Sequence, residues 1–274
     1  MKKNKISILG CGWYGLPLAR VLLENGYDVK GSTTSAAKRE LMQKEGIKAF
    51  LIDLVPECSS YDSQFFDSDV LIISIPPKSK SPSLKDYPSK IAAMIPAIQK
   101  SSIKQVIFIS STGVYQDGNF VVNELIDPQP ETETGRKILA TEELLRNDPN
   151  FTTTIIRFAG LIGPDRNLAK HFAGRSNIAN GLAPVNLIHL ADCIGLTQVI
   201  IEQSAFGNIY HGVTPNHPTR AAFYTAACSA SGLEMPAFVN ELTAWKQIES
   251  SNVPEILGYQ FLINDWMSYA QNSH

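Results

Sequence analysis

The stretch Gly10-Cys11-Gly12-Trp13-Tyr14-Gly15 decides the fold of this 274-residue chain. It follows a short apolar run at residues 6–9 and precedes an amphipathic pattern at residues 16–24, so we expect a strand, a tight turn and a helix. In such a turn the first glycine permits the bend, the second lets the backbone approach a pyrophosphate, and the third allows close helix–strand packing. The helix N terminus then favours phosphate. The alternative is a purely structural glycine turn.

Outward from this turn, apolar strands alternate with helices. The sequence predicts further strands at residues 27–30, 48–52, 70–75, 106–109, 153–156 and 208–211. It predicts further helices at residues 36–44, 91–100, 135–146 and 191–202, with a kink at Pro96. Apolar strands separated by helices predict an α/β fold with a Rossmann-type, doubly wound parallel sheet that is covered on both faces.

The alternation breaks after residue 163, because residues 164–187 are irregular and rich in Asn, Ala and Gly. We therefore expect two domains, each assembled from separated segments. Residues 1–163 and about 188–212 would form an NAD(P)-binding Rossmann domain. Residues 164–187 and 213–274 would form a small C-terminal substrate-binding lobe.

Composition narrows the class of protein. Apolar residues make up 44% of the chain and its formal net charge is -2, which gives no indication of nucleic-acid or membrane partners. Its cysteines, Cys11, Cys58, Cys193 and Cys228, lack C-x-x-C spacing, so no metal site is indicated. Scattered cysteines and the absence of a signal or membrane segment predict a cytoplasmic protein.

The end of the second predicted strand bears on which dinucleotide binds. NAD-selective sites usually place an acidic residue there, but no acid lies between Lys30 and Arg39. The hydroxyls and the basic pair in this segment suit a 2'-phosphate and favour NADP(H), with NAD(H) as the alternative. The candidate ligands are Ser32, Thr33, Thr34, Lys38 and Arg39. The other interpretation is a solvated helix start capped by Ser35.

Later motifs carry a resemblance to a known family. They are Ser110-Ser-Thr-Gly-Val-Tyr115, Arg157-Phe-Ala-Gly-Leu-Ile-Gly163-Pro164, Asn186-Leu-Ile-His189-Leu-Ala-Asp192 and Leu257-Gly258-Tyr259. In this order they resemble motifs of the extended short-chain dehydrogenase/reductases, the NAD-dependent epimerase/dehydratase superfamily. The matches run from residue 6 to residue 261.

The resemblance implies a catalytic Ser, Tyr and Lys, of which the Tyr is the acid/base and the Lys lowers its pKa. Ser111 matches the serine, but Thr134 stands at the tyrosine position and Ile138 at the lysine position, with Glu142 in register. The chain is therefore an atypical member. The candidate catalytic residues are Ser111, Tyr115, Thr134 and Lys137. The alternative role of Tyr115 is that of a packing residue, and the alternative role of Lys137 is an exposed ion pair with Glu133.

The resemblance also implies binding residues. Cofactor contacts are expected from the glycine turn, including Trp13 and Tyr14, and from Asp53, Ser74, Ile75 and Pro76 at the ends of later strands. Trp13 is expected to pack near the cofactor. Basic residues in the irregular segment could receive a carboxylate or phosphate, although a solvated loop is the alternative. The candidate substrate residues are Tyr87, Arg166, His171, Asn186 and His189.

Three functions stay open. The favoured one is an NADP(H)-dependent oxidoreductase that transfers hydride to or from a small carbonyl or related compound. The second is a non-catalytic NAD(P)-binding redox sensor or partner-binding protein, which the missing Tyr and Lys support. The third resembles a nucleotide-sugar epimerase or dehydratase. Residues 91–100 and 135–146 match helices through which relatives form dimers, so a homodimer is an expectation.

Overall fold

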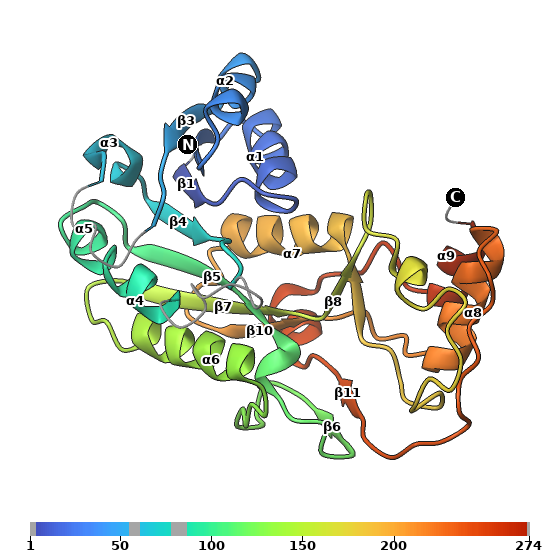
Figure 1. Cartoon of the computed structure of the whole chain (residues 1–274). Coiled ribbons are helices and arrows are strands. Elements are labelled where there is room, and N and C mark those ends of the chain that lie inside the picture. Colours follow the sequence, from blue (N-terminus) through green and yellow to red (C-terminus); the bar gives the residue numbers. More distant parts are fainter. Residues whose placement is uncertain (1–3, 55–60, 78–86, 273–274) are drawn as a thin grey trace. The chain divides into compact units, whose positions relative to one another are not determined.

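The strand, turn and helix expected around residues 10–15 are present in the computed structural model, which describes residues 4–54, 61–77 and 87–272. Within these residues a seven-stranded sheet has the order β10-β7-β5-β4-β1-β2-β3. β1 pairs in parallel with β2 and β4, β2 with β3, and β4 with β5. The predicted fold class, a Rossmann-type parallel sheet, is confirmed (Figure 1).

The strands of this sheet are β1 (Lys5–Leu9), β2 (Asp28–Thr33), β3 (Lys48–Leu51), β4 (Val70–Ile73), β5 (Gln105–Ser111), β7 (Thr152–Phe158) and β10 (Ile209–Gly212). The helices between them are α1 (Gly15–Glu24), α2 (Ala36–Lys44), α3 (Ser63–Phe66), α4 (Tyr87–Ala92), α5 (Ile95–Gln99), α6 (Glu133–Arg146) and α7 (Leu190–Glu202). All four residues of β4 are buried, as expected for a strand covered on both faces. Figure 1 shows α1 and α2 on one side of the sheet and α4 and α6 on the other.

Proline decides where the expected helix at residues 91–100 divides. Instead of one kinked helix, the chain forms α4 and then α5, with Pro96 in the first turn of α5. Proline has no backbone N–H, so it is tolerated at the start of a helix, where that donor would have no intrahelical acceptor. The break expected at Pro96 therefore lies between the two helices.

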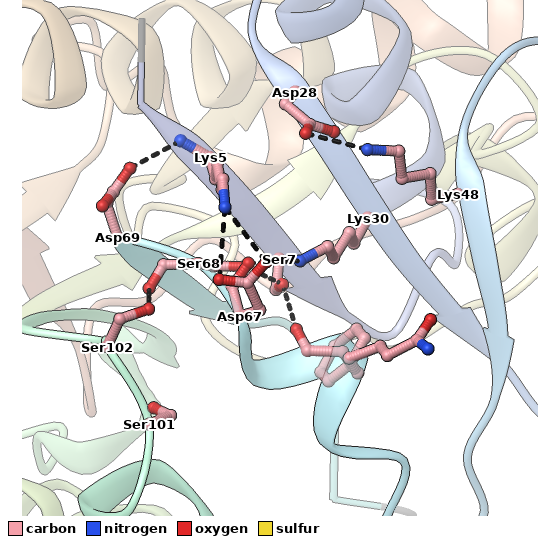
Figure 2. A network of polar contacts seen from close by, with 12 residues as sticks. Lys5, Ser7, Asp28, Lys30, Lys48, Asp67, Ser68, Asp69, Ser101 and Ser102 are labelled. Atoms are coloured by element: carbon pink, nitrogen blue, oxygen red, sulfur yellow. Dashed lines mark hydrogen bonds and ion pairs between the residues drawn. The ribbon is translucent and has the colours of Figure 1, made fainter.

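Polar contacts tie together the amino ends of β1, β2 and β4 (Figure 2). The Lys5 ammonium lies 3.0 Å from the Asp67 carboxylate, and the Lys48 ammonium lies 2.8 Å from that of Asp28. Lys30 is buried and donates to the carbonyl oxygen of Asp67, and burial lowers the pKa of its ammonium. This edge of the sheet is thus occupied by internal contacts.

The chain divides into two compact units. The first comprises Met1–Val114, Pro130–Arg157 and Thr197–Ile209, and the second comprises Tyr115–Gln129, Phe158–Leu196 and Tyr210–His274. The domain limits expected from the sequence stay a prediction. Cys11, Cys193 and Cys228 are buried and free, whereas Cys58 lies outside the described residues. No helix in the described ranges is long and apolar enough to cross a bilayer.

The second unit contains short elements that the sequence did not predict. β6 (Phe120–Val122) pairs with β11 (Lys246–Ile248), and β8 (Gly160–Ile162) pairs with β9 (Leu187–His189). It also contains the short helices η3 (Leu168–His171) and η4 (Val253–Leu257) and the longer α8 (Arg220–Ala230) and α9 (Trp266–Asn272). One apolar cluster of this unit joins Leu187 of β9, Phe223 of α8 and Trp266 of α9.

Candidate functional site

Each glycine of the turn after β1 has a distinct environment. Gly10 has a φ of +97°, a conformation that side chains rarely tolerate. A Cβ at Gly15 would lie 2.3 Å from the carbonyl oxygen of Gly10, so helix and turn touch through backbone atoms. A Cβ at Gly12 would meet nothing within 4 Å among the described residues. No described atom of the protein therefore occupies the space beside Gly12, and its backbone is open to a ligand on that side.

Two hydroxyl groups hold the turn in place. The N–H of Gly10 donates to Oγ of Ser32 on β2 at 2.9 Å, and Oγ of Ser74, after β4, donates to the carbonyl oxygen of Gly10 at 2.7 Å. Among the described residues no side chain caps the N terminus of α1. The start of this helix therefore provides backbone donors and the positive end of its dipole, which together favour a phosphate.

A cavity of about 460 Å³ lies at the carboxyl ends of β1 to β4, within the first unit. It occupies the point where the strand order reverses between β1 and β4, which is where parallel sheets of this type bind ligands. Predicted cofactor residues line it: Gly10, Gly12, Ser32, Thr33, Thr34, Lys38, Asp53, Ser74, Ile75 and Pro76. The other predicted cofactor residues, Trp13, Tyr14, Gly15 and Arg39, do not line it.

The segment after β2 combines helix capping with cavity lining. Ser35 caps α2 by accepting a hydrogen bond from the N–H of Lys38 at 3.3 Å, so the capping alternative is present. The same Lys38 lines the cavity. Nε of Arg39 is buried and has no hydrogen-bond partner among the described residues. A buried donor without a partner is costly, and a bound anion is one group that could satisfy it.

Two tyrosines near the turn make internal hydrogen bonds. The hydroxyls of Tyr14 and Thr197 on α7 lie 2.7 Å apart. Tyr87, which we expected to face the substrate, lines the cavity beside the glycine turn. Its hydroxyl donates to the carbonyl oxygen of Ile75 at 2.7 Å, and burial raises its pKa. Tyr87 is thus part of the cavity wall, and its hydroxyl proton is already engaged in this hydrogen bond.

The structure brings Ser111 and Thr134 into one neighbourhood. Ser111 ends β5, and its Oγ accepts the N–H of Gly113 at 3.1 Å. Thr132 caps α6 by accepting the N–H of Gly135 at 3.0 Å. A Cβ at Gly135 would lie 2.5 Å from the carbonyl oxygen of Gly113. The first turn of α6, which contains Thr134, is therefore packed against the turn that follows Ser111.

Lys137 lies half-buried on α6, three residues after Thr134. The alternative assignment paired it with Glu133, but within the described chain no salt bridge joins these two residues. Ile138, at the position of the family's lysine, is 6% exposed. Lys137 is therefore a half-buried cation about one helical turn from Thr134, with no ion pair to Glu133 in the described chain.

Tyr115 belongs to the second unit, where it is 3% exposed. Its hydroxyl lies 2.8 Å from Nε2 of His211, and Nδ1 of His211 lies 2.8 Å from the carbonyl oxygen of Glu249. A carbonyl oxygen only accepts, so the neutral ring carries its proton on Nδ1 and accepts the Tyr115 proton at Nε2. This arrangement is typical of a packing tyrosine.

Sequence reasoning missed a buried polar group beside Ser111. Arg157 donates to both carboxylate oxygens of Glu142, at 3.0 and 2.6 Å, and the two residues are 2% and 1% exposed. Ser110, which precedes Ser111, also donates to this carboxylate. Glu142 and Arg157 both lie within the matched motifs, but only the hydrogen bonds in the structure show that the two pair in the core.

A second cavity, of about 880 Å³, lies within the second unit. It is lined by three of the predicted substrate residues, Arg166, His171 and His189. Asn186 lies elsewhere: its amide donates to the carbonyl oxygen of Lys246 and accepts from the N–H of Ile248, both at 2.8 Å. Asn186 therefore serves to join β9 to β11.

Comparisons with known proteins agree with this geometry. Residues 10–192 match the model of an NAD(P)H-binding family. The chain is 35% identical to protein YeeZ of Escherichia coli strain K12 over 267 residues, which cover 96% of this chain and 97% of YeeZ.

Solved structures resemble the chain in fold. A functionally unknown conserved protein from Silicibacter pomeroyi has a TM-score of 0.76 at 21% identity, covering 98% of this chain and 97% of its own. A UDP-glucuronic acid 4-epimerase from Bacillus cereus, in complex with NAD, has a TM-score of 0.79 at 18% identity, covering 97% and 94%. The predicted resemblance to the epimerase/dehydratase superfamily is confirmed at the level of the binding domain and the fold.

Proposed function

This chain belongs to the NAD(P)H-binding family, and we propose that it is an NADP(H)-dependent oxidoreductase acting on a small carbonyl compound. The observation that carries the proposal is the cavity at the carboxyl ends of β1 to β4, next to an open Gly12. Its volume of about 460 Å³ and its lining, which includes glycines, hydroxyl side chains and the lysines Lys38 and Lys90, fit part of a dinucleotide.

The preference for NADP(H) rests on the segment after β2. Thr34 and Lys38 line the cavity there, and Arg39 has a buried Nε without a partner among the described residues. These donors suit the 2'-phosphate that distinguishes NADP(H) from NAD(H). Asp53 also lines the cavity and is exposed, and its carboxylate is the group that would oppose such a phosphate at close range.

The coenzyme, when bound, supplies the hydride chemistry. The chain's own residues have to orient a carbonyl group and stabilise the charge that develops on its oxygen. Ser111 at the end of β5 offers a hydroxyl for this purpose, and Thr134 offers a second one from the first turn of α6. Lys137 adds a positive charge on the same helix. With Tyr115 bonded to His211, we expect slow turnover.

The coenzyme part is tested by fluorescence titration with NADPH and NADH. Replacing Lys38 and Arg39 by Ala should weaken NADPH binding about 10- to 100-fold, the range expected for loss of charge-assisted hydrogen bonds. NADH binding should change much less. Lys44→Ala, at the exposed far end of α2, is the matched control. Equal losses for both coenzymes would remove the NADP(H) preference.

The catalytic part is tested by following NADPH oxidation across a broad set of small aldehydes, ketones and imines. Ser111→Ala should lower any observed kcat, whereas Tyr115→Phe should leave it nearly unchanged if Tyr115 only packs against His211. Absence of turnover across the set would reject the oxidoreductase proposal. It would leave the coenzyme-binding result standing.

A second function, a non-catalytic redox sensor, is favoured by one observation. The position of the family's acid/base holds Thr134, and the hydroxyl of the nearest tyrosine along the chain, Tyr115, is bonded to His211. A sensor has to bind NADP⁺ and NADPH with different affinities. Calorimetric titrations giving the same Kd for both forms would exclude it.

A further inference from the structure

The larger cavity, in the second unit, has an apolar floor. Phe223, Ile162 and Ala270 line it, and these three are 1%, 6% and 3% exposed as members of the same apolar cluster. Tyr269 also lines the cavity, with its ring centroid 5.5 Å from that of Trp266 in an edge-on contact. Packed aromatic and aliphatic side chains of this kind form a preformed surface for an apolar group.

A histidine donor stands on the same wall. Nδ1 of His189 accepts the N–H of Ala191 at 3.2 Å, which leaves the proton of the neutral ring on Nε2. The ring lies edge-on to Tyr269, with centroids 5.4 Å apart. Burial lowers the pKa of His189, against the opposing effect of Asp192, so the ring is a neutral donor near pH 7. Its backbone contact therefore fixes which nitrogen can serve a ligand.

The opening of the cavity is basic. Arg166, Lys170 and His171 line it with exposed side chains, and Asp165 is the acidic residue among the lining. Among the described lining residues, Arg166 and Lys170 thus bring two full positive charges and Asp165 brings one negative charge. In the described parts of the chain no hydrogen bond or ion pair engages the Lys170 ammonium.

A tight turn presents these basic residues. The N–H of Arg166 donates to the carbonyl oxygen of Gly163 at 3.0 Å, and Asp165 between them has a φ of +63°. Non-glycine residues rarely adopt this conformation, which costs free energy and is held here by the closed turn. Asn167 then caps η3, the short helix that carries Lys170 and His171. The loop is thus held locally by its own backbone hydrogen bond and by the Asn167 side-chain cap.

We propose that this cavity binds a small organic anion whose apolar body rests on the aromatic floor and whose charged end meets the basic loop. A volume of about 880 Å³ is in the range of small-molecule sites. A carboxylate or a phosphate monoester matches the donors, since Arg, Lys and a histidine N–H all donate to oxyanions. The site is defined by its own lining, so it does not depend on the oxidoreductase proposal.

The probes are 3-phenylpropanoate, phenyl phosphate and the uncharged 3-phenylpropan-1-ol, titrated calorimetrically into the full chain without coenzyme. We expect at least one anion to bind ten-fold or more tightly than the alcohol, and the better anion identifies the class. Lys170→Gln should weaken binding of the better anion about five- to ten-fold. His189→Asn keeps an acceptor for the Ala191 N–H but removes the Nε2–H donor, so it should weaken binding of that anion to a similar extent. Arg175→Gln is the matched control.

Arg175 belongs to the same segment, but it does not line the cavity: it bonds the carbonyl oxygen of His171 and lies over the Phe172 ring. Equal binding of the alcohol and the anions, no binding of either anion, or equal losses in Lys170→Gln and Arg175→Gln would each overturn the proposal. Coenzyme titration of the same variants separates the two proposals. Lys170→Gln should leave NADPH binding unchanged, and Lys38→Ala should leave anion binding unchanged.

Discussion

The hydroxyl of Tyr259 donates to Oδ1 of Asp192 at 2.9 Å, and this joins two sequence motifs that lie 67 positions apart. The Asp192 carboxylate is fully buried and also accepts the N–H groups of Leu262 and Ile263, at 2.7 and 3.2 Å. One side chain near the start of α7 thereby holds the segment that leads to α9. Burial, together with the proximity of this carboxylate, raises the pKa of Tyr259.

We predict that Tyr259→Phe lowers the free energy of unfolding by about 1.5–3 kcal/mol, as expected for loss of one hydrogen bond to a charged acceptor. Asp192→Ala should cost more, because it also removes the acceptor of the Leu262 and Ile263 N–H groups. Urea unfolding followed by tryptophan fluorescence measures both. A Phe variant as stable as the parent would show that the hydroxyl contributes nothing.

Gly195 makes room for the same tyrosine, because a Cβ there would lie 2.4 Å from its hydroxyl oxygen. Alanine normally favours a helix interior over glycine by about 1 kcal/mol. We nevertheless expect Gly195→Ala to destabilise the parent chain, since Tyr259 would have to move. In a Tyr259→Leu background the same substitution should be less costly. A double-mutant cycle by urea unfolding with no coupling would contradict this account.

The glycines of the turn after β1 should separate folding from coenzyme binding. Gly12→Ala adds a Cβ into open space, so it should leave the unfolding midpoint unchanged while weakening NADPH binding ten-fold or more. Gly15→Ala forces a Cβ against the carbonyl oxygen of Gly10 and should lower stability itself. Thermal unfolding and fluorescence titration of both variants provide the comparison. Unchanged NADPH affinity in Gly12→Ala would argue against a dinucleotide at this turn.

The pair formed by Glu142 and Arg157 predicts a large stability effect. Arg157→Met leaves a buried carboxylate without its partner, which typically costs about 3–5 kcal/mol. The double variant Glu142→Leu with Arg157→Met removes both charges and should recover much of that loss. Circular dichroism during urea unfolding tests this order. A double variant less stable than the single one would indicate that Glu142 and Arg157 also stabilise other groups in the core, and not only one another.

Two histidines predict a rise of stability with pH. Burial lowers the pKa of His217 and of His189 below the ordinary value of 6.5, despite opposing effects from Val185 and Glu249 on the former. Below pH 6.5 the unfolded chain therefore binds more protons than the folded chain, and stability falls as the pH drops toward the folded pKa values. Urea midpoints at pH 5.5 and 7.5 measure this difference. His217→Gln should reduce it.

Local patterns in the sequence predicted most of the first unit. α2 begins and ends at the expected residues, and the glycine turn lies between the expected strand and helix. β6 and β11 were missed because each is a three-residue strand that is stabilised by a partner more than 120 positions away. The contact between Tyr115 and His211 also links residues 96 positions apart, and no local pattern reports such a contact.

The open space beside Gly12 also has a consequence for work in living cells. A strain carrying alanine at that codon should contain the full amount of folded protein, since no atom of the described chain is crowded. Any growth defect of such a strain would then reflect the loss of coenzyme binding and not the loss of the folded protein. A deletion strain removes both at once. Comparing the two alleles would assign each phenotype to one of these causes.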